Sequence, residues 1–470
     1  MASSAKGTGA PARALREGAI GLPGVLLQST THLAPAVTLL LSLQFLVLFA
    51  GAAVPLALVV SFGIALMLAL SAAELAKRFP SAGGYYAYTS RTLGARAGFL
   101  TAWMYALYSP ILPGFMLAYL GSILDASLRA EYGVHVPWWV WLAGGACLTA
   151  VVAHRGIQLS VRTLVVLGLA EVAIVVALAI SGIVDPGSGG VNAEPFRFST
   201  SPTLRGLYLA IVFSIGSYSG WEAAAPLAEE SRAARRAVPL AMVVSLVGMG
   251  VFMVFCSWGI LVGWGTNDLF GFLFSRQFPT FVLAQRLWGS AWVLVLFALL
   301  NSALGVAVAC NNVATRMWYS MARDGALPRG LAELHPRYRT PTRAIALQLA
   351  DVLVLGLGLG AWVGPFQAFV LLGLVFSLAL VFIYGAGNLG VVRYFTGEAR
   401  RELNPVLHLL FPVASTAALV WAAWKSVHPL PTSPTRYAPV VVTLWLALGL
   451  VVLLRSPPPE PAAHELAEET

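Results

Sequence analysis

The sequence has few charged residues for its length. Of its 470 residues, 29 are Lys or Arg and 20 are Asp or Glu, which is 10% of the chain, whereas soluble domains carry about 25%. A chain of this size cannot form a water-soluble surface from so few charges. The composition therefore excludes a cytosolic enzyme. It also argues against a nucleic-acid partner despite the net charge of +9, because the cations lie between apolar runs rather than in one patch.

Cysteine is also scarce. Cys147, Cys256 and Cys310 all lie inside apolar stretches without metal-ligand spacing, so neither a disulfide framework nor a zinc site is indicated. The sequence has no Walker-type phosphate loop, which argues against an ATP-driven pump. The few acidic residues within apolar runs are isolated in sequence and form no catalytic cluster. We therefore expect no enzyme activity, no cofactor and no bound metal centre.

Long apolar runs make up most of the chain, in which 58% of the residues are hydrophobic. A helix needs about 20 mostly apolar residues to cross the hydrocarbon core of a bilayer. The sequence therefore predicts an all-α integral membrane protein with 12 transmembrane helices. They are expected at residues 19–48, 52–78, 95–124, 137–154, 161–184, 204–228, 237–263, 286–322, 342–363, 366–392, 404–424 and 437–455.

The positions of Lys and Arg predict the orientation in the membrane. If the predicted helices alternate in direction, 22 of the 29 basic residues fall in segments on the side that carries the N-terminus. Cytoplasmic loops carry an excess of Lys and Arg, so both termini are expected in the cytoplasm and the protein in the cell membrane. Residues 1–18 and 456–470 are expected to be disordered cytoplasmic tails.

Two predicted helices contain polar and helix-breaking residues in their middle. Residues 28–36 read QSTTHLAPA and residues 214–222 read SIGSYSGWE. Unpaired polar groups are costly against lipid, so the first stretch is either a proline kink or an unwound segment that faces a cavity. Interrupted helices at matching positions of two halves mark the central site of many transporters. The predicted substrate-binding residues are Ser29, Thr30, Thr31, His32, Ala34, Pro35, Ala36, Ser214, Gly216, Ser217, Tyr218, Ser219 and Gly220.

Ionisable residues inside membrane helices are functional candidates by default. Glu222 directly follows the second polar stretch, where it either caps loose backbone amides or takes part in gating. Glu171 lies deep in the helix expected at 161–184, as a proton carrier, a sodium ligand or a member of a structural pair. Asp351 is expected to have a structural role. His32 either packs within the protein or takes part in binding substrate or carrying a proton.

Three stretches together resemble the amino acid–polyamine–organocation (APC) family of transporters, the amino acid permeases, over nearly the whole chain. They are Glu74–Tyr88, which contains a P-x-x-G-G-x-Y-x-Y pattern, Phe213–Pro239, and Arg323–Pro341, which begins RDGALP and ends RTP. The resemblance implies the leucine-transporter-type (LeuT) fold. Ten core helices over 19–392 would form two inverted halves, at about 19–184 and 204–392, followed by helices 11 and 12 at 404–455.

The resemblance also implies roles for particular residues. Substrate would bind between the breaks in helices 1 and 6, where family members often have a G-S-G-like triplet whose amides hold the substrate carboxylate. This chain has Ala34-Pro35-Ala36 there, and Pro35 has no amide to donate. Glu222 matches a glutamate used in gating or proton sensing, and Tyr105 matches a tyrosine often paired with that gate. Glu171 lies near a position where several proton-coupled relatives carry a lysine.

These observations predict a secondary active transporter that moves amino acids or related amines by alternating access, as a symporter or an exchanger. The coupling ion would be a proton or sodium, and the protein would be a monomer or a homodimer in the lipid bilayer. A membrane channel, or a transporter for another small organic solute, is the alternative, since polar helix breaks also line pores.

Overall fold

The computed structural model describes residues 21–455 except 82, 156–160, 276, 324–326, 339 and 430–432. The tails expected at 1–18 and 456–470 lie outside the described residues. The described part of the chain is helical and contains no β-strand, which confirms the all-α prediction.

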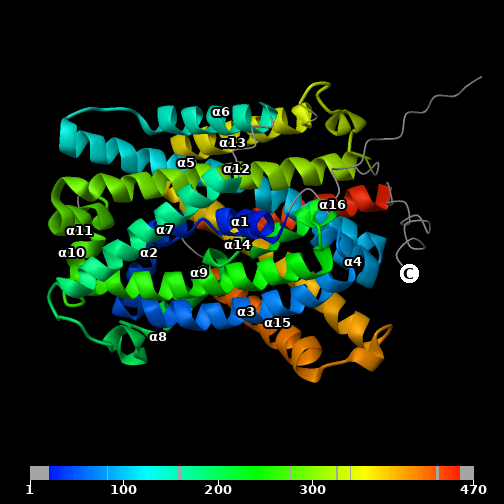
Figure 1. Cartoon of the computed structure of the whole chain (residues 1–470), viewed down its shortest axis with the longest axis horizontal. Coiled ribbons are helices and arrows are strands. Elements are labelled where there is room, and N and C mark those ends of the chain that lie inside the picture. Colours follow the sequence, from blue (N-terminus) through cyan, green and yellow to red (C-terminus); the bar gives the residue numbers. More distant parts are fainter. Residues whose placement is uncertain are drawn as a thin grey trace, which may run out of the picture.

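Most of the long helices run in one general direction and form a bundle (Figure 1). In this view α1 and α14 lie near the centre, with α6 and α13 along one edge and α3 and α15 along the other. The α-helices are α1 (Leu22–Leu33), α2 (Pro35–Ala50), α3 (Val54–Arg78), α4 (Tyr85–Leu93), α5 (Ala95–Tyr132), α6 (Trp138–Arg155), α7 (Val161–Val184), α8 (Leu204–Ser217), α9 (Ala234–Trp264), α10 (Leu269–Leu273), α11 (Pro279–Trp288), α12 (Val293–Arg323), α13 (Thr342–Val363), α14 (Pro365–Thr396), α15 (Phe411–Val427) and α16 (Ala438–Arg455).

Nine helical segments of the described chain are long and apolar enough to cross a membrane, whereas the sequence predicted twelve. The first segment, Leu22–Arg78, has 57 residues and contains two predicted spans, because α1, α2 and α3 follow one another almost without interruption. The predicted spans at 137–154 and 204–228 are not among the nine. α6 ends in the polar pair His154 and Arg155, and α8 stops after 14 residues. The twelve-helix layout therefore stays a prediction.

Glycines allow α7 and α9 to pack backbone against backbone. A Cβ atom on Gly182 of α7 would lie 2.5 Å from the carbonyl oxygen of Gly259 on α9, and one on Gly259 would lie 2.6 Å from the carbonyl oxygen of Ala179. Small residues that let helices approach closely are a common basis of association in membranes. This contact fixes the position of α7, the helix that carries Glu171.

The 38-residue helix α5 packs against α6, α12, α13, α14 and α16. Its contact with α16 contains a reciprocal tryptophan pair. The indole N–H of Trp103 donates to the carbonyl oxygen of Trp445 at 2.8 Å, and the indole N–H of Trp445 donates to the carbonyl oxygen of Trp103 at 2.9 Å. The rings stack with centroids 4.8 Å apart, so the pair attaches α16 to α5.

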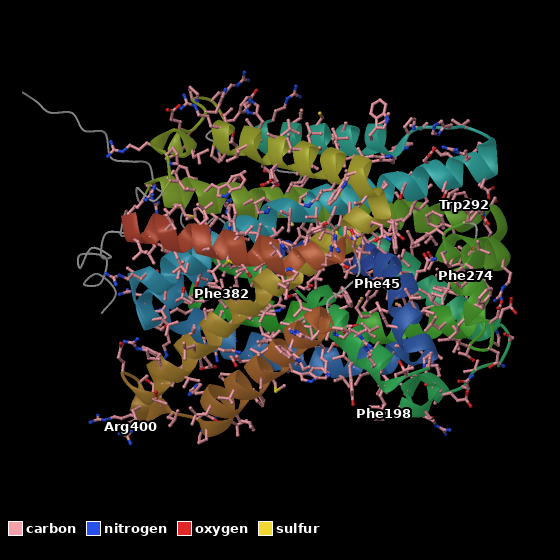
Figure 2. All side chains as sticks on the ribbon, turned by 180° about the vertical axis from the view of Figure 1, so that it is seen from behind. Phe45, Phe198, Phe274, Trp292, Phe382 and Arg400 are labelled. Atoms are coloured by element: carbon pink, nitrogen blue, oxygen red, sulfur yellow. The ribbon has the colours of Figure 1, made fainter. Side chains whose placement is uncertain are left out.

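The two ends of the bundle are distinguished by their side chains. Figure 2 places Arg400 at one end and Phe274 toward the other, with Phe45 between the middle and Phe274. At the Arg400 end, Arg78 at the C-terminus of α3 forms an ion pair with Glu402. We call these the Arg400 end and the Phe274 end.

Candidate functional site

The helix predicted at 19–48 is interrupted at one residue. α1 ends at Leu33 and α2 begins at Pro35. Ala34, between them, has φ 48° and ψ 68° and is the one non-glycine residue in the described chain with a positive φ. Strained backbone of this kind persists where the surroundings hold it, often at functional sites. The N–H of Ala34 donates to the carbonyl oxygen of Thr30 at 3.0 Å.

The interruption is narrower than the nine-residue stretch that the sequence indicated. Residues 28–33 are helical in α1, and the hydroxyl groups of Ser29 and Thr30 find acceptors within the protein. Thr30 Oγ1 donates to the carbonyl oxygen of Leu26 at 2.9 Å, and Ser29 Oγ donates to the carbonyl oxygen of Trp221 at 3.2 Å. Thr31 faces α12, where a Cβ atom on Gly305 would lie 3.3 Å from Thr31 Cγ2.

The helix predicted at 204–228 is also interrupted. α8 ends at Ser217, residues 218–220 form a turn, and a 3₁₀ helix, η4, continues over Trp221–Glu230. Gly220 has φ 121°, a conformation that side-chain-bearing residues rarely adopt. The Ser219 hydroxyl donates to the carbonyl oxygen of Gly216 at 2.7 Å. Tyr218 turns away from the break, since its hydroxyl donates to the carbonyl oxygen of Leu58 on α3 at 3.1 Å.

The two breaks are in direct contact. A Cβ atom on Gly220 would lie 2.9 Å from His32 Cδ2, 3.0 Å from His32 C and 3.0 Å from Leu33 N. Together with the hydrogen bond from Ser29 to Trp221, this places the end of α1 directly against the turn after α8. Two segments far apart in the sequence therefore form one structural unit.

A cavity of about 110 Å³ lies on one side of this contact. By this measure one water needs roughly 10–15 Å³, so several waters or a small solute fit. Its described wall contains no charged side chain. The polar side chains of the wall are His32, Thr38, Ser42, Ser217, Ser219 and Ser377, and its aromatic side chains are Phe45, Phe115, Phe213, Phe369 and Phe376. Phe45 places this cavity toward the Phe274 end (Figure 2).

A second cavity, of about 10 Å³, lies on the other side. Its wall includes Tyr85, which follows the end of α3 and places the cavity toward the Arg400 end. His32 lines both cavities, and its side chain is only 4% exposed. His32 thus forms the partition between the two spaces, and Gly220 packs against it. The second wall also contains Gly83, Gly84, Tyr105, Tyr108, Glu222, Ala223, Pro226, Val313 and Met317.

Glu222 joins the second break to α5. Its Oε2 atom accepts a hydrogen bond from the N–H of Gly220 at 2.9 Å, and its Oε1 atom accepts one from the hydroxyl of Tyr108 at 2.9 Å. Tyr105 lines the same cavity, and its ring lies 5.4 Å from that of Tyr108. The tyrosine that bonds Glu222 is therefore Tyr108, one helical turn beyond the residue that the resemblance indicated. The two tyrosines are three residues apart and so share one face of α5. This spacing is the feature of the sequence that could have indicated Tyr108 as well as Tyr105.

Glu171 lies at the first break. Its carboxylate accepts hydrogen bonds from Asn301 Nδ2 at 2.6 Å and Ser302 Oγ at 3.1 Å, both on α12. Its helix, α7, also packs against α1 and α2, the two helices that meet at the first break. Described residues include no group of three or more His, Cys, Asp or Glu side chains that could hold a metal ion.

The structure brings together part of the predicted residue set. His32, Gly216, Ser217 and Ser219 line the larger cavity. The others contribute to the breaks or to their packing rather than to its wall: Ser29, Thr30, Thr31, Ala34, Pro35, Ala36, Ser214, Tyr218 and Gly220. The phenylalanines of the wall were not predicted, because nothing distinguishes them from other apolar residues of their helices.

Comparison with known proteins assigns the family. The family model for amino acid permeases matches residues 24–454. The chain belongs to the amino acid permease family. An uncharacterized transporter of Mycobacterium tuberculosis is 28% identical over 386 residues, 79% of each chain. The low-affinity putrescine importer PlaP of Escherichia coli is 23% identical over 83% of this permease and 82% of PlaP. The glutamate/serine transporter AimA of Bacillus subtilis is 24% identical over 80% of this permease and 72% of AimA. The permease is thus a multi-pass membrane transporter.

Proposed function

We propose that this permease is a secondary active transporter that moves an amino acid or a related amine across the cell membrane by alternating access. The observation that carries the proposal is the partition at His32, which lines two separate cavities where the helix breaks meet and against which Gly220 packs. Alternating access requires a central site that is reached from each side in turn. Relatives that import putrescine or transport glutamate and serine support a small amine or amino acid as the substrate.

In this proposal the chain has twelve membrane helices in the LeuT arrangement. The 57-residue segment Leu22–Arg78 is long enough for two crossings, and α6 and the α8–η4 pair provide the other two that the described spans lack. The broken pair α1–α2 is the first membrane helix of the first half, and the broken pair α8–η4 is the first membrane helix of the second half. Both termini and the Arg400 end face the cytoplasm, and the larger cavity faces outward.

Proton coupling is proposed to act through Glu222 or Glu171. Glu222 bonds the N–H of Gly220 and the hydroxyl of Tyr108, so a proton on Glu222 removes acceptor capacity at the partition and changes the relative stability of the outward and inward forms. Glu171 with Asn301 and Ser302 offers oxygen atoms from two helices at the first break, which also suits sodium. Each ion gives a distinct dependence of uptake on the imposed gradient.

Uptake into proteoliposomes tests the proposal. Radiolabelled putrescine, phenethylamine and phenylalanine would be offered with an inward proton gradient, an inward sodium gradient or neither. We expect saturable uptake of at least one solute, increased by one of the gradients. Gly216→Leu, which fills the larger cavity next to Ser377, should abolish it, whereas Gly248→Leu should not, because a Cβ atom there meets nothing within 4 Å. If solute flux through the wild type and through Gly248→Leu instead rises linearly with solute concentration, the protein is a channel and the proposal is refuted.

A further inference from the structure

Cys310 lies at the level of the partition, on the face of α12 that follows both cavities. Val306 of this helix lines the larger cavity and Val313 lines the smaller one. Residues three or four positions apart share one face of a helix, and Cys310 lies four residues after Val306 and three before Val313. The Cys310 side chain is buried. Its thiol is therefore placed between the two cavities, where His32 forms the partition.

The thiol contacts the imidazole ring of His32. Cys310 Sγ lies 3.7 Å from His32 Nε2 in a buried contact, and α12 packs against α1. A second contact joins the same two helices, since a Cβ atom on Gly305 would lie 3.3 Å from Thr31 Cγ2. The hydroxyl of Ser109 on α5 donates to the carbonyl oxygen of Cys310 at 3.3 Å. The backbone that carries the thiol is thus held from α5 as well as from α1.

The other ring nitrogen of His32 has no partner. His32 Nδ1 is buried without a hydrogen bond in the described chain, and the residue is only 4% exposed. Buried polar atoms nearly always have a partner in folded proteins. Among the described residues the thiol of Cys310 is the polar side chain that this ring contacts. The imidazole therefore has capacity left for a ligand, and it lines both cavities through which a ligand can arrive.

The pair of side chains favours a soft ion of low coordination number. Thiolate is a soft ligand that selects ions such as Cu⁺, and imidazole also binds copper. Zinc takes four ligands, at least three of them from the protein, whereas the described residues include no group of three or more His, Cys, Asp or Glu side chains that could hold a metal ion. Glu222 shares a cavity wall with His32. Its carboxylate already accepts hydrogen bonds from Gly220 and Tyr108. Cu⁺ and Ag⁺ form stable complexes with two ligands, so one sulfur and one nitrogen meet their requirement.

Charge and distance both suit a monovalent ion. When such an ion binds, the Cys310 thiol releases its proton to water and becomes a neutral metal thiolate, so the buried pair carries no net charge before or after binding. A divalent ion would leave a positive charge there, and isolated buried charges are costly. Bond lengths of about 2.3 Å to sulfur and about 2.0 Å to nitrogen, taken from zinc sites, put the two ligand atoms roughly 4.3 Å apart in a linear complex. The observed 3.7 Å has to widen by only about 0.6 Å.

We propose that Cys310 and His32 form a binding site for a soft monovalent cation, Ag⁺ or Cu⁺, and that the bound ion locks the partition closed by joining α12 to α1. Alternating access requires the partition to open, so the ion acts as an inhibitor of transport. The binding site stands on the geometry of the two side chains. Its effect on uptake rests on the proposed function.

The three cysteines of the chain provide matched proteins for a titration with Ag⁺, which unlike Cu⁺ is stable in aerated buffer. Cys147→Ser with Cys256→Ser leaves Cys310 as the single thiol, and we call this variant the Cys310 protein. Cys147→Ser with Cys310→Ser leaves Cys256, which is also buried, and we call this variant the Cys256 protein.

Isothermal titration calorimetry in chloride-free buffer measures binding to the two proteins. The Cys310 protein should bind one Ag⁺ and release one proton, with a Kd lower than that of the Cys256 protein by about tenfold or more. His32→Gln in the Cys310 protein should raise the Kd by about tenfold or more, because the nitrogen ligand is lost. If Cys310→Ser folds poorly, Cys310→Ala provides the same comparison, because it also removes the sulfur.

Uptake into proteoliposomes tests the lock. Ag⁺ should reduce uptake by the Cys310 protein several-fold and should leave uptake by the Cys256 protein unchanged, each relative to the same protein without Ag⁺. Zn²⁺ at the same concentration should inhibit neither protein, because the site offers it too few ligands.

The possible results separate the site, the lock and the transport function. Equal Ag⁺ affinity of the Cys310 and Cys256 proteins, or an affinity that His32→Gln leaves unchanged, would overturn the site. Binding at Cys310 without inhibition of uptake would overturn the lock, while the proposed transport function stands. Absence of saturable uptake without Ag⁺ would instead refute the proposed function and would leave the result of the titration unaffected.

Discussion

Replacing Gly220 with alanine should destabilise the protein by pushing the two helix breaks apart. At φ 121° a side-chain-bearing residue is strained, at a cost of about 1–3 kcal/mol. The new Cβ atom would also lie 2.9–3.0 Å from His32 and Leu33, and such overpacking costs roughly 1–3 kcal/mol. The expected loss of stability is the sum, about 2–6 kcal/mol.

Two glycines separate these contributions. Gly190 has φ 63° and open space around it, so Gly190→Ala reports backbone strain alone, about 1–3 kcal/mol. Gly248 lies within α9 without a positive φ and with nothing within 4 Å, so Gly248→Ala should stabilise by roughly 0.5–1 kcal/mol. The order of stability should be Gly248→Ala, wild type, Gly190→Ala, Gly220→Ala.

Unfolding of the purified variants in one detergent gives this order, and uptake per folded molecule reports the consequence for transport. Adding His32→Ala to Gly220→Ala removes one of the three close contacts and should restore stability only in part, because the backbone atoms of His32 and Leu33 remain. If Gly220→Ala is no less stable than Gly190→Ala, the breaks do not touch and the account of the partition is wrong.

Two further substitutions test contacts of α5. Tyr108→Phe removes the hydroxyl bonded to Glu222 and should cost about 1–3 kcal/mol and alter the pH profile of uptake, because a buried acceptor loses its donor. Tyr119→Phe on the same helix is the control, and equal pH profiles would contradict the role of Tyr108. Trp103→Phe removes one of the two indole hydrogen bonds to Trp445. It should cost about 0.5–1.5 kcal/mol in thermal unfolding, and an unchanged melting temperature would show that the pair does not hold α16.

The sequence predicted the positions of the two helix breaks more accurately than the number of residues in each break. Pro35 lacks an N–H and Gly220 tolerates a positive φ, so both mark the interruption in their local sequence. Ser29 and Thr30 looked like part of the unwound segment, but their hydroxyls bond carbonyl oxygens. Whether a hydroxyl finds a carbonyl on its own or another helix depends on packing, which a single sequence does not show.

The rotation of each helix limited the prediction of the site. Tyr105 and Tyr108 lie one turn apart, and only the packed structure shows which hydroxyl bonds Glu222. Tyr218 lies inside the second break, yet its ring is directed to α3. Glu171 was recognised as a functional candidate, with several partners open. Its hydrogen bonds with Asn301 and Ser302 join two helices far apart in the sequence, so no local pattern indicated them.

The central claim is that a small solute binds where the two helix breaks meet. An experimental structure of the full chain in lipid nanodiscs with phenethylamine tests it most directly. The account predicts ligand density beside His32 and the Gly216–Ser219 segment, with Ala34 still between two separate helices. Density confined to another part of the protein, or one continuous helix through Ala34, would contradict it.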